Sequence, residues 1–154
     1  MIRVLRDAWL FSRMMTWRAV LPVLKRRVRI ATLAKVMWCE PNGRREETDP
    51  CRVVDFARRL YWRPRARRTD ICLERSLLAY RYLSQAGSAP LLVIGIRRPG
   101  SSVIGHAWVV MDGEPLYESA AEVGEYASLF SFGQGGALVE SLSGRPRAGD
   151  ARAG

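Results

Sequence analysis

The spacing of apolar residues changes once along this chain, at Gly87, and this change restricts the fold more than any other feature. Before Gly87 the apolar residues recur every three or four positions, which is typical of helices with one buried stripe. After Gly87 they form short runs bounded by turn residues, which is typical of strands. Helices followed by strands, rather than alternating with them, predict an α+β architecture. The 154 residues are enough for one domain with a hydrophobic core.

The first half predicts helices with recognisable starts. One is expected from 2 to about 20, and a second from Pro22 to about Trp38, because proline is favoured at the first position of a helix. Asp49 is expected to cap a third helix, with Pro50 at its first position. These helices would form an N-terminal layer of the molecule.

A fourth helix carries Cys72. Thr69 or Asp70 is expected to cap it, which would leave Cys72 in the first turn, and Gly87 is expected to end it. The backbone N–H of Cys72 is then a candidate donor to a developing oxyanion.

The second half predicts a small antiparallel sheet on which the cysteine helix packs. Strands are expected at 91–97, 103–111 and 114–118, the last two joined by the turn Asp112-Gly113. From Ala121 onward the pattern predicts only a short helix or loop. We expect one domain over 1–143, with a basic helical part at 1–62 and the catalytic helix and sheet at 69–143, and a disordered tail at 144–154.

Positive charge is concentrated in the first half. Residues 1–70 contain 18 of the 25 Lys and Arg but 7 of the 15 Asp and Glu, a net charge of +11, whereas the remainder has −1. Such a surface attracts nucleic acid, anionic lipid or an acidic polypeptide. The alternative is that the arginines form an ordinary solvated surface with no binding role. The candidate partner- or substrate-binding residues are Arg63, Arg65, Arg67 and Arg68, which lead directly into the cysteine helix.

The cysteines and the single histidine limit metal and redox chemistry. Three irregularly spaced cysteines favour a reducing compartment, and Arg13 and Arg18 interrupt the N-terminal apolar positions, so we expect no cleavable signal peptide and a cytoplasmic location. One histidine and no Cys-x-x-Cys pair leave too few ligands for zinc, and we expect no metal and no cofactor.

Cys72 and His106 together indicate nucleophilic catalysis. A thiol near a helix start and an imidazole on a later strand are the two parts of an activated cysteine nucleophile. The helix N-terminus and a neighbouring imidazolium both favour the thiolate. Each residue taken alone would more often be a buried structural side chain. Trp108 lies on the same strand face as His106 and is expected either to wall a substrate subsite or to pack in the core.

The imidazole needs an orienting group, for which Asp112 and Glu118 are candidates. Asp112 is about 20 Å from His106 along the strand and in the turn, so it is excluded. A two-residue turn would pair Glu118 with Ala107, on the wrong face. We therefore expect a three-residue loop at 111–113, which places Glu118 opposite His106.

The sequence around these residues resembles a known family. Cys-Leu-x-Arg-Ser-Leu at 72–77, Leu-x-Ile-Gly-Ile-Arg at 92–97, His-Ala-Trp-Val at 106–109 and Asp-Gly at 112–113 are similar to the leader-removing cysteine protease of lasso-peptide biosynthesis. This is the catalytic half of a split maturation protease in the transglutaminase-like superfamily, with a papain-like or transglutaminase-like fold.

The resemblance implies hydrolysis of the bond between leader and core of a ribosomally made precursor peptide, with Cys72 as nucleophile, His106 as base and acid, and Glu118 in a position where relatives usually carry Asp. It also implies two partners, a separate leader-recognition protein and an ATP-dependent ring-closing enzyme. The basic N-terminal helices are our candidate docking face.

Three alternatives stay open. The same residues support transglutaminase-type acyl transfer to an amine. A non-enzymatic basic helical module would bind nucleic acid or anionic lipid, although we expect no nucleic acid and favour packing over peripheral membrane contact. The chain could also be an inactive pseudoenzyme.

Overall fold

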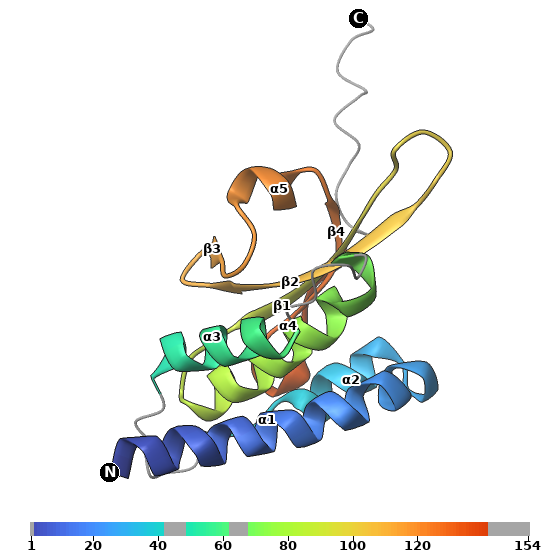
Figure 1. Cartoon of the computed structure of the whole chain (residues 1–154). Coiled ribbons are helices and arrows are strands. Elements are labelled where there is room, and N and C mark those ends of the chain that lie inside the picture. The colour runs from blue at the N-terminus through green and yellow to red at the C-terminus, as the bar shows by residue number, and fades with distance from the viewer. Residues whose placement is uncertain (1, 42–48, 62–67, 142–154) are drawn as a thin grey trace, which may run out of the picture.

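The computed structural model describes residues 2–41, 49–61 and 68–141, and it confirms the predicted α+β architecture. Helices come first and a five-stranded antiparallel sheet follows, with the strand order β3-β2-β1-β4-β5 (Figure 1). The elements are α1 (Ile2–Arg27), α2 (Ile30–Met37), α3 (Pro50–Leu60), α4 (Arg68–Gln85), β1 (Leu91–Arg97), β2 (Ile104–Met111), β3 (Glu114–Pro115), α5 (Ala120–Gly124), β4 (Ala127–Phe132), the 3₁₀ turn η1 (Gln134–Gly136) and β5 (Leu138–Ser141).

The start of α3 is as predicted, and the break between α1 and α2 is not. Asp49 accepts a hydrogen bond of 2.9 Å from the backbone N–H of Cys51, with Pro50 at the first helical position. Pro22 does not begin a helix but lies inside α1. A proline within a helix removes one backbone hydrogen bond. Burial of Leu21, the residue before it, helps to hold the helix continuous there.

The helix α4 begins earlier than the sequence predicted. Its first residue is Arg68, so Thr69 and Asp70 lie within the helix instead of before it, and Cys72 follows the first turn. The other end is as expected. Gly87 has φ +86°, and the N–H of Ser88 donates to the carbonyl of Leu83 at 3.0 Å, which is the hydrogen bond of a Schellman cap.

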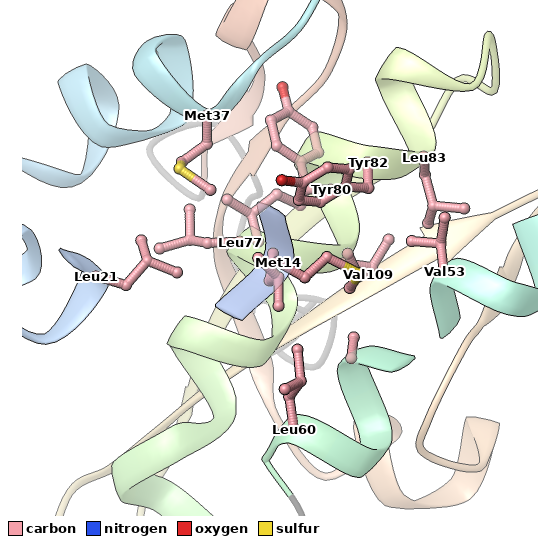
Figure 2. Close-up of a cluster of buried hydrophobic side chains, with 14 of the residues drawn as sticks. Met14, Leu21, Met37, Val53, Leu60, Leu77, Tyr80, Tyr82, Leu83 and Val109 are labelled. Carbon is pink, nitrogen blue, oxygen red and sulfur yellow. The ribbon is translucent and has the colours of Figure 1, made fainter. Parts of the chain in front are cut away.

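The core lies around α4, between the N-terminal helices and the sheet. Figure 2 shows Met14 and Leu21 from α1, Leu77 from α4 and Val109 from β2 in this cluster, and all four are fully buried. The hydroxyl of Ser76 donates to the backbone carbonyl of Ala107 at 3.0 Å and joins α4 directly to β2. A helix enclosed on both sides is a rigid base for a functional residue.

The sheet contains two strands that the sequence did not predict. β1 has the predicted bounds, and the short helix expected from Ala121 is present as α5, whereas β4 and β5 form where no strand was expected. The turn between β4 and β5 packs tightly on α2, because a Cβ on Gly136 would lie 2.5 Å from Cα of Lys35. In β5 the neighbouring residues Leu138 and Val139 are both apolar and both exposed. The strand therefore lacks the alternation of buried apolar and exposed polar residues by which a strand is recognised in a sequence.

The outer face of α1 contains a single charged side chain between Val4 and Val23, that of Arg6. Apart from Arg6, every exposed side chain from Val4 to Val23 is apolar, small or hydroxyl-bearing, although the chain has a net charge of +10. In Figure 1, α3 and α4 lie between this helix and α5. Among the residues that the structure describes, no helix combines the length and the apolar content that a membrane crossing requires.

Candidate active site

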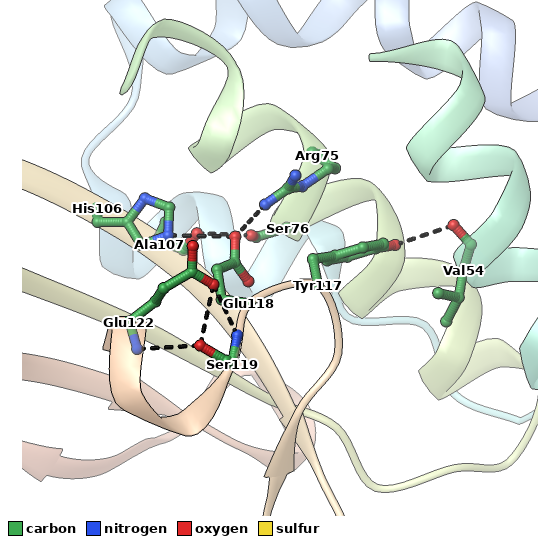
Figure 3. A network of polar contacts seen from close by, with 9 residues as sticks. All are labelled: Val54, Arg75, Ser76, His106, Ala107, Tyr117, Glu118, Ser119 and Glu122. Atoms are coloured by element: carbon green, nitrogen blue, oxygen red, sulfur yellow. Dashed lines mark hydrogen bonds and ion pairs between the residues drawn. The ribbon is translucent and has the colours of Figure 1, made fainter. Parts of the chain in front are cut away.

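His106 and Glu118 are in contact. His106 lies on β2, and its Nε2 is 3.2 Å from Oε1 of Glu118 (Figure 3). Both side chains are largely buried, at 11% and 10% exposure. The contact agrees with the prediction, and a carboxylate at this distance fixes both the orientation of the ring and the proton on Nε2.

The register that was expected to produce this contact is wrong. Met111 pairs with Glu114, so Asp112-Gly113 is a two-residue turn with positive φ at both residues, the type I′ arrangement. Continued further, this ladder would place Glu118 opposite Ala107. The strand instead ends at Pro115, and Glu118 reaches His106 from the loop that follows. Asp112 lies exposed in the turn, as predicted.

Arg75 is a member of the site that the sequence analysis did not single out. Its Nη2 donates to the same Glu118 Oε1 that faces His106 (Figure 3). The guanidinium also lies over the ring of Tyr117, with Cζ 4.4 Å from the ring centroid. Position 75 follows Cys72 by three residues, so the two side chains share a face of α4. That spacing was the signal available in the sequence.

Cys72 completes the group from α4. Cys72 is 4% exposed, and its interaction with His106 is the largest cause of the raised pKa of that imidazole. Because Nε2 faces Glu118, Nδ1 is the ring nitrogen left for the thiol. The hydrogen bond with Cys72 and then that with Glu118 raise the pKa of His106 to about 9, against the opposing effect of burial. A charged imidazolium beside the thiol is therefore favoured at neutral pH.

The carboxylate of Glu118 is held in its charged form. Burial acts to raise its pKa, but the hydrogen bond from His106 and the charge of Arg75 outweigh burial and lower it. Glu118 is therefore an anion between two cationic partners, as an orienting group requires.

Because α4 starts early, the backbone N–H of Cys72 cannot take its expected role as a donor to a substrate oxyanion. In an α-helix the N–H of each residue donates to the carbonyl four positions earlier, so the N–H of Cys72 is paired with the carbonyl of Arg68. It is not a free donor toward a substrate oxyanion. The expectation for this donor was wrong because it placed Cys72 in the first turn, where N–H groups are unpaired.

A pocket of about 380 Å³ opens beside His106. It is lined by Ile71, Arg75, Arg97, Ile104, His106, Glu118, Glu122, Glu125 and Tyr126. Trp108 is not part of this lining. It is buried, stacks on His106 with ring centroids 5.8 Å apart, and lies so close to Gly95 that a Cβ there would be 2.8 Å from the indole. Trp108 therefore supports the imidazole from behind.

The candidate arginines are not tested by this geometry. Arg63, Arg65 and Arg67 lie outside the described residues, as does the side chain of Arg68. The described residues contain no group of three or more His, Cys, Asp or Glu that could hold a metal ion.

Comparison with known proteins gives one family. The model of the transglutaminase-like superfamily matches residues 5–131. The chain belongs to the transglutaminase-like superfamily. This superfamily includes cysteine peptidases and acyl transferases and is typically enzymatic. No curated protein and no solved structure matches the chain at a significant level.

The raised pKa of His106 makes the stability of this transglutaminase-like domain depend on pH. A pKa raised from 6.5 to about 9 stabilises the fold fully below pH 6.5, and this contribution is lost as the pH rises through 9. Urea unfolding of wild type and His106→Gln at pH 6, 7.5 and 9.5 measures it. The difference in free energy of unfolding should shrink steadily with pH. A difference independent of pH would contradict the raised pKa.

Proposed function

We propose that this chain is a cysteine peptidase that removes the leader peptide from a lasso-peptide precursor. One observation carries the catalytic part: His106, at the wall of a pocket, contacts Glu118 at 3.2 Å and has its pKa raised first by Cys72. Nucleophile, base and orienting group are the three parts of an activated thiol. Membership of the transglutaminase-like superfamily supports the same chemistry.

The proposed reaction has two halves. The Cys72 sulfur attacks the scissile carbonyl, and His106 delivers a proton to the departing amine, so the peptide C–N bond breaks and a thioester forms. Water then adds to the thioester with its proton taken by His106, which releases the carboxylic acid and restores the thiol. Glu118 keeps Nε2 protonated throughout, so that Nδ1 carries the transferred proton.

The lasso-peptide substrate rests on the sequence resemblance at 72–77, 92–97, 106–109 and 112–113. The same resemblance supports a leader-recognition protein that presents the precursor, a ring-closing enzyme that takes the freed core, and a cytoplasmic location. These parts of the proposal concern the substrate and partners, and the chemistry of the thiol does not depend on them.

Product analysis tests the function. The purified chain is incubated with precursor and leader-recognition protein, with and without a primary amine, and the products are identified by mass spectrometry. Free leader and free core, unchanged by the amine, are expected for a peptidase. An amine adduct would favour the acyl transfer that other members of the superfamily perform. Intact precursor with rapid binding of anionic lipid or nucleic acid would favour a binding module.

The largely apolar outer face of α1, from Val4 to Val23, is the surface we assign to the leader-recognition protein. Val4, Leu5, Trp9 and Val23 are all more than half exposed, and apolar faces of this kind usually mark interaction sites. Exposed arginines lie within the face at Arg6 and beyond its end at Arg26 and Arg27. Pairing with a second copy would oppose these like charges, so we expect a partner with an apolar face and acidic edges.

Substitution of one valine on this face tests the assignment. Val23→Glu should weaken binding of the leader-recognition protein at least about tenfold, because it buries a carboxylate in an apolar interface. The matched control is Val139→Glu on β5, since the two valines are 61% and 62% exposed. Calorimetric titration measures the affinity. Equal affinities for the two variants would show that the partner binds elsewhere.

A further inference from the structure

We propose that Arg75 is a positioning residue, which holds the carboxylate of Glu118 against His106. The inference deepens the proposed function and rests on it. Its geometric basis is a single shared atom: Oε1 of Glu118 accepts from Arg75 Nη2 and also faces His106 Nε2 (Figure 3). Arg75 therefore acts on the thiol only through Glu118 and His106.

Glu118 needs such a tether because its backbone gives it little support. The ladder with β2 ends at Pro115, and the last backbone hydrogen bond is from the N–H of Leu116 to Val109 at 3.0 Å. A glutamate on a loop has three side-chain torsions to restrict, and each costs entropy. Its second oxygen, Oε2, is buried and has no hydrogen-bond partner among the described residues, so Oε1 alone fixes the carboxylate.

Arg75 is itself rigidly placed. It projects from α4, the most enclosed helix of the molecule, and its side chain is 19% exposed. Tyr117, next to Glu118 in sequence, lies under the guanidinium, and its hydroxyl donates to the carbonyl of Val54 on α3 at 3.4 Å. A planar guanidinium that stacks on a ring while bonding a carboxylate has few other orientations. Arg75 from α4 and Tyr117, which is bonded to α3, therefore restrict the movement of the loop that carries Glu118.

The charge of Arg75 has a predictable effect on His106. A nearby cation makes the imidazolium less favourable and so lowers the pKa of His106. Loss of this charge alone would therefore raise that pKa. If Arg75 holds Glu118 against His106, however, its removal loosens the contact that helps to raise the pKa of His106, and that pKa should fall. The direction of the shift thus separates positioning of Glu118 from the charge of Arg75 acting alone.

The experiment compares Arg75→Gln and Arg75→Lys. Arg75→Gln should lower kcat about ten- to a hundredfold with little change in KM. Its alkaline limit of activity should also move to lower pH, because the contact with Glu118 that raises the pKa of His106 is loosened. Arg75→Lys should restore the wild-type limit through its charge, with only partial recovery of kcat, since an ammonium lacks the planar fork. The matched control is Arg58→Gln, because Arg58 approaches the same Tyr117 ring at 5.9 Å from the exposed side of α3.

A double-mutant cycle with Glu118→Gln separates action through Glu118 from contact with substrate. In the Glu118→Gln background, Arg75→Gln should cost little more. If it lowers kcat equally in both backgrounds, or changes only KM, Arg75 contacts the substrate and the inference is overturned.

One readout does not require the proposed activity. His106 is the only histidine, so its ring signals in the NMR spectrum of the untagged protein have no overlap. The imidazole should titrate at lower pH in Arg75→Gln than in wild type or Arg58→Gln. An unchanged or raised titration refutes the positioning role even in an active enzyme. A lowered titration without precursor cleavage by wild type would leave the positioning intact and refute the proposed peptidase function.

Discussion

Cys72→Ala is expected to reduce precursor cleavage by at least about a thousandfold, because the substitution removes the atom that forms the thioester. The fold should persist. The Cys72 side chain is small and lies at the edge of the core, where a methyl group fits the same space. The measurements are single-turnover cleavage of the presented precursor, and circular dichroism with thermal unfolding to verify the fold.

The other two cysteines supply the controls. Cys51 is exposed and Cys39 is half-buried, and neither is among the groups that shift the pKa of His106, whereas Cys72 is the first of them. Cys39→Ala and Cys51→Ala should therefore cleave the precursor at close to the wild-type rate. Substantial cleavage by a folded Cys72→Ala protein would end the cysteine-peptidase proposal, whatever the controls show.

Glu118→Gln should lower kcat about a hundredfold. The amide no longer stabilises the imidazolium, and it leaves the largely buried charge of Arg75 without its carboxylate. Since the hydrogen bond with Glu118 contributes to the raised pKa of His106, that pKa should fall. The alkaline limit of activity should then move to lower pH, in the same direction as the shift expected for Arg75→Gln. A pH–rate profile of kcat/KM measures both effects.

Substitutions of two acidic residues serve as controls for this test. Asp112→Asn changes the exposed residue of the β2–β3 turn and should leave activity unchanged. Glu118→Asp shortens the side chain by one methylene while keeping its charge, so it should retain part of the activity. Wild-type turnover by Glu118→Gln would show that Cys72 and His106 work as a pair without a third group.

The parts of the fold that sequence predicted are those encoded by neighbouring residues. The cap at Asp49-Pro50, the end of α4 at Gly87 and the bounds of β1 each depend on a few adjacent positions. Pro22 shows the opposite case. Its local preference is to begin a helix, but packing of the neighbouring Leu21 and Leu24 against the core keeps α1 continuous through it. β4 and β5 likewise depend on pairing with the central strands more than on their own pattern.

The sequence predicted that His106 and Glu118 meet, but not the path of the chain that brings them together. The contact between His106 and Glu118 was expected from strand register, yet it is made by a loop after the strand ends. Pro115 was the available signal, because a residue without an N–H weakens a ladder at that point. Arg75 was visible only as a neighbour of Cys72 at helical spacing. Its importance depends on where the loop carries Glu118, which no local pattern encodes.

The unequal exposure of the three thiols also determines which of them air oxidises first. Cys51 is exposed on α3, whereas Cys72 lies beneath the surface, so Cys51 is the thiol that oxidants and a second copy of the chain reach first. Storage without reductant should yield covalent dimers through Cys51 whose Cys72 is still reduced. A titration of free thiols would then underestimate the active fraction. Cys51→Ser removes this side reaction and yields a preparation suited to labelling the inner thiol with small electrophiles.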